Sequence, residues 1–394
     1  MKEAKDMKEG WEYKKLGEAC DVIENISWSD VDDNTTYQYI DLSAVNRNTY
    51  SIDDTTTISK SDAPSRAKQI VKHKDILFGT TRPLLKRVCV VPVENDNNIC
   101  STGFCVLRPK NNMILSKWVF YQLLSEKYYN FIEPLQSGAN YPAVSDRIVK
   151  SYIIPLPSLS EQQQIVSELD LLSGVIEKQK AQLEELDKLA QSIFYDMFGD
   201  PVTNEKGWEL RKLKELGQLG RGVSKHRPRN APELLGGSMP LIQTGDVSNS
   251  GMYITAYSST YSEIGVAQSK VWLAGTLCIT IAANIGNCAI LTFDACFPDS
   301  VVGFIANEKV ALKEYVYYIF ERMQSILEAN APAVAQKNIN LKILDELLIP
   351  LPPLSLQQEF AAKVEAIEAM KAKVRQSLKE VETLFASRMD YYFN

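Results

Sequence analysis

The residues best suited to chemistry in this sequence are basic side chains gathered in one short segment that contains a glycine. The segment Arg221-Gly-Val-Ser-Lys-His-Arg-Pro-Arg229 holds four Arg and Lys residues and one His. Arginine forks fit phosphate oxygens and guanine edges, and a glutamine side chain fits an adenine edge. The segment therefore predicts a surface that binds double-stranded DNA. The residues predicted to contact DNA in this half are Arg221, Lys225, His226, Arg227, Arg229, Gln243 and Thr244.

A second group of basic residues lies in the first half of the chain. Arg66, Lys68, Lys72 and Lys74 precede the segment Thr80-Thr-Arg-Pro-Leu-Leu-Lys-Arg87. Each group has an alternative interpretation as a solvated run of charge without a ligand, and that alternative stays open above all for Lys68 to Lys74. The residues predicted to contact DNA in this half are Thr80, Thr81, Arg82, Lys86 and Arg87.

The acidic net charge of −6 does not exclude DNA binding, because the acidic excess is confined to one segment. Residues 158–199 carry eight acidic and three basic side chains, and the other parts of the chain are close to neutral. A local basic patch is therefore compatible with the composition.

Motifs of catalysis and of cofactor binding are missing from the sequence. It contains no GxxxxGK[ST] phosphate loop, no GxGxxG after a strand and no GxSxG, nor the Asn/Asp-Pro-Pro-aromatic motif of amino-methylating enzymes. The seven cysteines form no CxxC and only two histidines accompany them, which disfavours a metal site and predicts reduced thiols in a cytoplasmic protein. No apolar run is long enough to span a membrane. These features predict a binding protein without a cofactor of its own.

The elements that must position these residues occur twice along the chain. Ile154-Pro-Leu-Pro-Ser-Leu-Ser-Glu-Gln-Gln163 returns 195 residues later as Ile349-Pro-Leu-Pro-Pro-Leu-Ser-Leu-Gln-Gln358, and Trp11-Glu returns as Trp208-Glu. A repeat of this length indicates a duplicated domain with a tail. We predict two globular bodies, residues 1–157 and 200–353, followed by helical segments at residues 158–199 and 354–394.

Both tails carry apolar residues at alternating spacings of four and three, which predicts two long helices paired as an antiparallel coiled coil. At about 1.5 Å per residue, each would be roughly 60 Å long. Ser160 with Gln163, and Ser355 with Gln358, are predicted as capping boxes. Gln179, Lys371 and Arg388 are polar residues within the seam that are predicted to fix its register. The apolar seam residues are Ile165, Leu169, Leu172, Ile176, Leu183, Leu186, Phe360, Val364, Ile367, Val374, Leu378 and Val381.

The bodies are predicted to mix strands with short helices, which gives an α/β (mixed α+β) fold with a pseudo-twofold internal repeat. Helices are expected at Lys117–Ser125 and Leu312–Glu321. Strands are expected at Asp75–Thr80, Lys86–Val91, Gly103–Leu107, Thr276–Ile281, Cys288–Thr292 and Ser300–Ile305.

Several of these residues resemble a known family, the specificity (S) subunits of type I restriction–modification systems. The resemblance lies in the two bodies, the repeated Ile-Pro-Leu-Pro-x-Leu-Ser-x-Gln-Gln and the helix end Phe194-Tyr-Asp-Met-Phe-Gly-Asp200. The second body resembles one class of target recognition domain through Arg221–Asn230, Gln243–Asp246, Ala282–Ile285 and Phe297–Ser300. Asn284 joins the predicted DNA contacts on this ground. The first body resembles another class through Phe78–Pro83 and Ser101–Pro109.

The resemblance implies a non-catalytic subunit whose two recognition domains each read one half of a bipartite, asymmetric DNA site. The helices would set the spacing and dock two modification subunits, which bind S-adenosylmethionine and methylate adenine. Restriction subunits that use ATP with Mg would cleave unmodified DNA. Two alternatives stay open at this point: an unrecognised enzyme, and a coiled-coil adaptor that binds proteins without DNA specificity.

Overall fold

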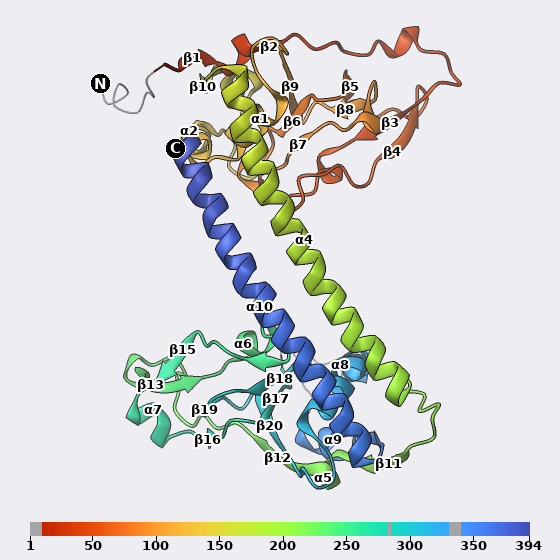
Figure 1. The fold of residues 1–394 in the computed structure, drawn as a ribbon, viewed down its shortest axis with the longest axis vertical. Helices are drawn as coiled ribbons and strands as arrows, with labels where there is room; N and C mark the ends of the chain where they lie inside the picture. The colour runs from red at the N-terminus through yellow and green to blue at the C-terminus, as the bar shows by residue number, and fades with distance from the viewer. Residues whose placement is uncertain (1–9, 283–284, 331–339) are drawn as a thin grey trace. The chain divides into compact units, whose positions relative to one another are not determined.

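The chain divides into two compact units in the structure, which is a computed structural model that describes residues 10–282, 285–330 and 340–394. Unit 1 comprises Met1–Lys178 with Ser377–Asn394, and unit 2 comprises Gln179–Gln376. Two long helices, α4 (Leu159–Phe198) and α10 (Leu354–Phe393), contribute to both units, and each runs without a break for 40 residues (Figure 1).

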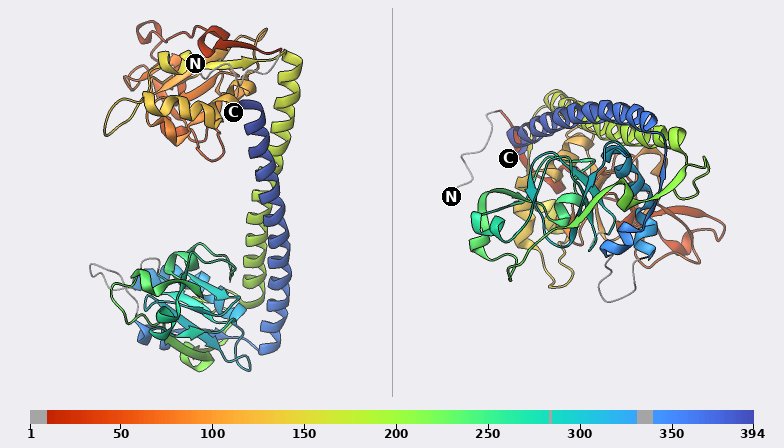
Figure 2. Two further views of the ribbon diagram at one scale, coloured as in Figure 1. Left: turned by 90° about the vertical axis from the view of Figure 1, so that its left-hand side faces the viewer. Right: turned by 90° about the horizontal axis from the view of Figure 1, so that it is seen from below.

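The two long helices pair in opposite directions, as predicted. In unit 1, the first half of α4 lies beside the last turns of α10, where Arg388 Nε is 2.7 Å from Glu168 Oε1 (Figure 2). The Tyr392 hydroxyl donates to the other Glu168 oxygen at 2.7 Å. In unit 2, the buried Lys371 ammonium is 2.6 Å from Asp187. Arg388 and Lys371, two of the polar residues predicted within the seam, thus form ion pairs between the helices.

The predicted seam is covered along its whole length, but the bodies bury part of it. None of its twelve apolar residues is exposed. Ile165 and Leu169 pack into the core of unit 1, and Phe360, Val364 and Ile367 pack into the core of unit 2. The remaining seven are half-buried. Each long helix is therefore anchored at its start by the body that precedes it. Further along α4, Leu186 packs against the core of unit 2.

The predicted capping boxes are wrong. Helix α4 begins at Leu159, one residue before Ser160. The side chain that caps it belongs to Ser158, whose hydroxyl accepts a hydrogen bond from the amide of Glu161 at 3.2 Å. Helix α10 likewise begins before Ser355, directly after two prolines. The serines of the predicted boxes therefore lie inside the first turns, where the Ncap geometry is not available.

Buried glutamines tie the start of each long helix to its body. Gln162 and Gln357 are fully buried and stand 195 residues apart, at equivalent positions of the repeat. Oε1 of Gln162 accepts a hydrogen bond from the amide of Leu115 at 3.0 Å. Oε1 of Gln357 accepts one from the amide of Leu312 at 2.9 Å. Their Nε2 groups donate to the carbonyls of Pro157 and Pro352 at 3.0 and 2.9 Å. A buried amide satisfied on both sides fixes the helix direction relative to the body.

In each unit, the strand that follows the Trp of the repeated Trp-Glu sequence pairs with the strand that contains Ile-Pro-Leu. Strands β1 (Glu12–Lys15) and β10 (Ile153–Leu156) pair antiparallel in unit 1. Strands β11 (Glu209–Lys212) and β21 (Leu348–Leu351) do the same in unit 2. The two motifs that mark the ends of each body in the sequence therefore close it as a two-stranded ribbon, from which the long helix starts.

Unit 1 contains two four-stranded sheets, ordered β2-β9-β6-β7 and β4-β3-β8-β5. Its other strands are β2 (Cys20–Asp21), β3 (Thr36–Ile40), β4 (Thr56–Ser59), β5 (Ala67–Ile70), β6 (Ile76–Gly79), β7 (Val88–Val90), β8 (Ile99–Ser101) and β9 (Phe104–Pro109). Its short helices are α1 (Ser116–Leu124), α2 (Glu126–Ile132) and α3 (Asp146–Ser151).

Unit 2 contains a five-stranded sheet, β12-β20-β17-β18-β14, and a four-stranded sheet, β15-β13-β19-β16. Its other strands are β12 (Gly217–Arg221), β13 (Leu235–Leu241), β14 (Tyr253–Ile254), β15 (Ser259–Tyr261), β16 (Val271–Trp272), β17 (Leu277–Thr280), β18 (Cys288–Leu291), β19 (Ala295–Cys296) and β20 (Val301–Ala306). Its short helices are α5 (Leu213–Leu216), α6 (Thr244–Ser248), α7 (Glu263–Ala267), α8 (Lys313–Asn330) and α9 (Leu341–Asp345). The six predicted strands and both predicted short helices are confirmed, and α8 runs further than predicted.

The end of each long helix is received by an aromatic socket on the unit that it reaches. In unit 1, the ring of Phe393 lies 4.9 Å from that of Trp118, whose indole N–H donates to the carbonyl of Pro155. In unit 2, the ring of Phe198 lies 4.9 Å from that of Tyr315, whose hydroxyl donates to the carbonyl of Pro350. In both sockets the terminal phenylalanine contacts an aromatic residue that donates to a proline carbonyl of the Ile-Pro-Leu-Pro strand. The sequence repeat therefore corresponds to a repeated packing arrangement.

The seven cysteines are all buried and none is in a disulfide. Burial disfavours the charged thiolate and raises the pKa of Cys89 to about 12. At pH 8 only about one Cys89 side chain in 10,000 is then a thiolate. We expect no thiol of the native protein to react quickly with Ellman's reagent, and all seven to react once urea unfolds the chain. A fast-reacting thiol in the native protein would contradict this placement.

Candidate nucleic-acid interface

The basic segment of unit 2 leaves strand β12 and lies against the turn that precedes β20. The amide of Gly222 donates to the carbonyl of Val301 at 2.9 Å, and that of Val223 to the carbonyl of Phe297 at 3.1 Å. A side chain at Gly222 would overlap the carbonyl oxygens of Phe297 and Pro298. The glycine noted in the sequence is therefore needed for this close backbone contact.

Three arginines of this segment converge on Asp299. Arg221 Nε donates to the Asp299 backbone carbonyl at 2.7 Å. The Asp299 carboxylate lies 2.5 Å from Arg229 and 3.6 Å from Arg227. Both guanidinium side chains remain about half exposed, at 45% and 55%. The structure thus gathers the predicted arginines on one surface and leaves about half of the Arg227 and Arg229 side chains open to solvent.

The residues between these arginines are held through their backbone. The amides of Lys225 and His226 both donate to Oε1 of Gln268, at 2.6 and 3.0 Å. The Lys225 side chain is exposed, and the half-buried His226 ring lies 3.8 Å from Glu233. Gln268 was not identified from the sequence, because nothing in its local pattern marks a contact more than 40 residues away.

The other predicted residues of unit 2 have structural roles or lie outside the described residues. The Gln243 side chain accepts a hydrogen bond from the amide of Asp246, and the Asp246 carboxylate accepts the amide of Gln243 at 2.8 Å. This reciprocal cap starts helix α6 and engages the side-chain oxygen of Gln243, while the residue itself remains exposed. Thr244 is half-buried in the first turn of that helix. Asn284 is not among the described residues.

In unit 1, the two predicted threonines are partly or wholly covered. Thr80 is 7% exposed, and its hydroxyl donates to the carbonyl of Gly103 at 2.8 Å, which leaves its side chain no free donor for DNA. Thr81 is half-buried and forms a β-bridge with Ala143. Both residues therefore fix the segment that carries the basic side chains after them.

Arg82 and Lys86 each lie over an aromatic ring. The Arg82 guanidinium is 4.8 Å from the ring centre of Tyr141, and the Lys86 ammonium is 4.6 Å from that of Tyr129. Tyr141 is 68% exposed, so it offers an aromatic face beside a cation at the surface. Such a pair suits a nucleic-acid surface. Arg87 is half-buried, and its Nε has no hydrogen-bond partner within the described residues.

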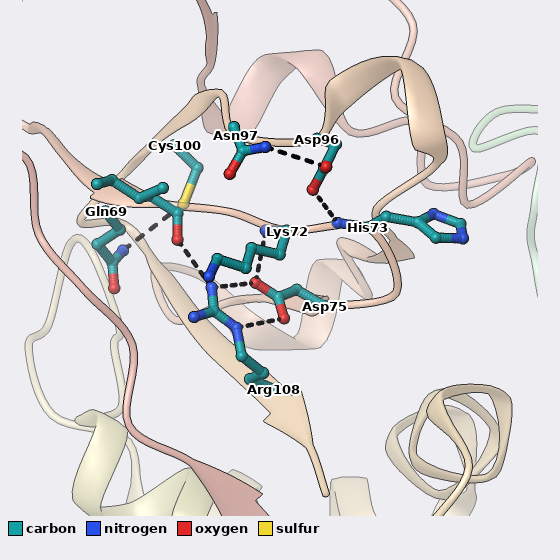
Figure 3. A network of polar contacts seen from close by, with 9 residues as sticks. Gln69, Lys72, His73, Asp75, Asp96, Asn97, Cys100 and Arg108 are labelled. Carbon is teal, nitrogen blue, oxygen red and sulfur yellow. Dashed lines mark hydrogen bonds and ion pairs between the residues drawn. The ribbon is translucent and has the colours of Figure 1, made fainter. Parts of the chain in front are cut away.

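A buried ion pair holds the segment that carries Lys68, Lys72 and Lys74. Asp75 is 1% exposed and accepts two hydrogen bonds from Arg108, at 2.9 and 2.8 Å (Figure 3). The pair raises the pKa of the Arg108 guanidinium, chiefly through these hydrogen bonds. The Lys72 amide donates to the same carboxylate at 2.8 Å. The three lysine side chains are exposed, so this network orders a basic segment, from strand β5 to the loop after it, at the surface of unit 1.

Replacing Asp75 by Asn is expected to destabilise unit 1 strongly. Removing one partner of a buried ion pair leaves the other charge uncompensated, which costs about 3–5 kcal/mol. Urea unfolding of the full chain measures the loss. Asp33→Asn is the matched control, because Asp33 is 89% exposed and its pair with Lys60 is screened by solvent. Equal unfolding midpoints for the two variants would contradict the role of the Asp75–Arg108 pair.

Removing the four basic residues Arg221, Lys225, Arg227 and Arg229 together is expected to weaken DNA binding. Each lost phosphate contact should reduce the slope of log K against log salt by about 1, and an arginine that reads a base should contribute about 1–3 kcal/mol. Titrations of labelled DNA over a range of salt measure both effects. The control replaces Arg211, Lys212 and Lys214, which pair with neighbouring glutamates of the same unit. An unchanged affinity and salt slope would contradict the assignment.

No described residue belongs to a cluster of three or more His, Cys, Asp or Glu side chains able to hold a metal ion. Within the described ranges, no helix is both long and apolar enough to cross a membrane. The geometry is thus that of two separate basic surfaces, one on each unit, each set on a scaffold of buried hydrogen bonds.

Comparison with known proteins gives these surfaces a context. The family described as type I restriction modification DNA specificity domain matches residues 8–188 and, a second time, residues 205–383. The chain is 23% identical over 396 residues to a putative type I restriction enzyme specificity subunit (MjaX) of Methanocaldococcus jannaschii, covering 96% of this chain and 91% of that protein. It is 22% identical to the HindI specificity subunit of Haemophilus influenzae, covering 78% and 83% of the two chains.

Solved structures of type I restriction–modification proteins are similar to this chain over its whole length. A chain from a study of type I restriction–modification complex assembly and conformational transition is 25% identical, with a TM-score of 0.59 over 99% of both chains. The type I S subunit of M. genitalium is 14% identical, with a TM-score of 0.61 over 100% of this chain and 98% of that one, which shows a shared fold. With two copies of the specificity domain and a fold shared over its whole length, the chain belongs to the family of DNA specificity subunits of type I restriction–modification systems.

Proposed function

We propose that the chain reads a two-part, asymmetric DNA site, with each body contacting one half and the long helices setting the distance between the halves. One observation carries this proposal: each unit contains its own specificity domain and its own exposed basic segment, and the two segments differ in sequence. Arg82, Lys86 and Arg87 stand on unit 1, whereas Arg221, Arg227 and Arg229 stand on unit 2. Different contacting side chains select different bases, so the two half-sites differ.

We infer that the chemistry on DNA belongs to partner subunits and that this chain is not catalytic. Two modification subunits would dock on the helices, bind S-adenosylmethionine and methylate adenine, and restriction subunits would use ATP with Mg to cleave DNA in the cytoplasm. The absence of phosphate-loop, dinucleotide and methyltransferase motifs from the sequence supports this division. Assays of the purified chain alone should therefore detect neither cleavage nor methylation.

An adaptor without DNA specificity receives no support, because the specificity-domain match covers both bodies and not the helices alone. The experiment that tests the proposal is methylome sequencing of a host that expresses the chain with its modification subunit. We expect adenine methylation at one bipartite sequence with unlike halves. The control is a host with the modification subunit alone. A single contiguous motif, or the same motif in the control, would contradict the proposal.

As a sharper form of the test, residues 205–353 are replaced by the equivalent body of another specificity subunit. One half of the methylated sequence should then change, and the half read by unit 1 should stay the same. A change in both halves would show that the bodies do not read DNA independently.

A further inference from the structure

Asp299 occupies a central place in the basic segment of unit 2. Its carboxylate contacts Arg229 and Arg227 through different oxygens, at 2.5 and 3.6 Å, while its backbone carbonyl accepts a hydrogen bond from Arg221. One acidic residue therefore touches three of the basic side chains predicted to bind DNA.

These contacts orient the guanidinium groups and leave them positively charged as a group. A guanidinium has five N–H donors in a fixed plane. Arg229 turns one nitrogen to Asp299, and Arg227 turns Nη2 to Asp299 while its Nη1 donates to the carbonyls of Ser224 and His226 at 2.5 and 2.9 Å. Two cations share one carboxylate, so a net positive charge remains. Because both side chains are about half exposed, each keeps donors for a ligand.

Asp299 itself stands on a rigid support. The preceding residue pair, Phe297 and Pro298, accepts backbone hydrogen bonds from Val223 and Val301 at 3.1 and 3.0 Å. The Phe297 ring is fully buried and stacked on Trp272, with ring centres 4.9 Å apart. A side chain oriented before binding loses less conformational freedom when it binds.

The carboxylate also determines which part of DNA suits these arginines. A phosphate placed between Arg227 and Arg229 would face the negative charge of Asp299 at short range, and like charges repel. A guanine edge is uncharged and offers two acceptors, O6 and N7, at the spacing of a guanidinium fork. The arrangement therefore favours a base edge over a phosphate at this point of the surface.

We propose that Asp299 is a positioning residue that sets base discrimination at the half-site read by unit 2, by holding Arg227 and Arg229 for contact with guanine edges. The proposal rests on the proposed function, because it assumes that each unit reads one half-site. It names the base chemistry that this surface selects, which neither the fold nor the family match specifies.

The test uses the full chain in complex with its modification subunit. The DNA carries the two-part sequence that methylome sequencing identifies for this complex. Competition binding compares this DNA with DNA altered in one half-site or the other. A bidentate contact discriminates between bases by roughly 5- to 150-fold. We expect Asp299→Asn to lose at least about 5-fold of the discrimination at the second half-site. Affinity for unrelated DNA should rise, because one negative charge is removed from the surface.

Two controls separate positioning from structure and charge. Discrimination at the first half-site should be unchanged, since unit 1 is untouched. Glu308→Gln removes the same charge from unit 2 at a residue that pairs with Lys313, and it should leave discrimination at both half-sites unchanged. Adding Asp299→Asn to an Arg227→Gln, Arg229→Gln variant should cause no further loss, because the residues that it positions are already gone.

The outcomes are distinct. Unchanged discrimination in Asp299→Asn overturns the proposal, and so does an equal loss of affinity for all DNA, which would indicate a structural role. An additive loss in the combined variant overturns it as well, even where the single variant folds poorly. Failure of the proposed function has another signature: the wild-type complex would then show no two-part site.

Discussion

Inserting one heptad into both long helices is expected to abolish binding to the native DNA site or to lengthen its spacer by about three base pairs. Seven residues add about 10 Å to a helix, and DNA rises about 3.4 Å per base pair. The insertions belong between Lys178 and Gln179 in α4 and between Gln376 and Ser377 in α10, at the boundaries of the two units. A heptad preserves the side of the helix that the seam occupies, so pairing of the helices should persist.

Methylome sequencing of the heptad variant reports the new spacer, and DNA titration reports the loss of the old site. The control inserts seven residues after Thr203, an exposed residue in the connection between α4 and β11, where the helices keep their length and the hydrogen bonds between Asn204 and Trp208 are kept. That variant should recognise the native sequence. An unchanged spacer in the heptad variant would show that the helices do not set the distance between half-sites.

A fragment of residues 1–199 is expected to form a twofold dimer that reads a palindrome. The fragment lacks the last turns of α10, which fill the aromatic socket of unit 1, but α4 of a second copy carries the equivalent residues. The offset of 195 puts Phe198 in the place of Phe393 beside Trp118. Two identical bodies related by a twofold axis would read the first half-site twice, in opposite orientations.

Sedimentation measures the dimer, and methylome sequencing with the modification subunit measures the recognised sequence. The same offset puts Ile193 in the place of Arg388, so Glu168 would lose its ion pair and the dimer should be weaker than the pairing in the full chain. Phe198→Asp is the matched control and should leave the fragment monomeric. A stable monomer of the unchanged fragment, or recognition of the original asymmetric site, would contradict the duplicated architecture.

The sequence predicts well those elements that the spacing of apolar residues within a short stretch of chain determines. The strands around Ile76–Gly79 and Leu277–Thr280 are short apolar runs between turn residues, and the long helices follow one spacing for 40 residues. The capping residues were missed for a related reason. Ser158 and Ser160 both precede a suitable partner, and only the position of the first turn, set by the neighbouring ribbon of β1 and β10, chooses between them.

The candidate interface is less visible in the sequence, because contacts between distant segments decide its details. Composition identifies the arginines of unit 2. Asp299 lies in the motif Phe297–Ser300, 70 residues after Arg229, but nothing in the sequence indicates that it contacts them. Tyr141 is one aromatic among many until the fold brings it beneath Arg82. Thr80 follows a buried strand and has the polarity of a surface residue, yet its hydroxyl is used within the fold. A residue type shows what a side chain is able to bind, whereas its neighbours decide whether it is free to do so.

Unit 1 is built from two separate stretches of the chain, and this has a consequence for synthesis of the protein. Its core takes Met389 and Phe393 from the last turn of α10, whereas unit 2 is one continuous stretch of chain. A ribosome that has released the first body has therefore made an incomplete core, with the Trp118 socket open until Met389 and Phe393 have been added. Unit 2 needs no residue beyond Gln376, so all residues of the second body are synthesised before those of the first are complete. Chains that end before Met389 would carry the first recognition surface, but the core of unit 1 would be left open to water.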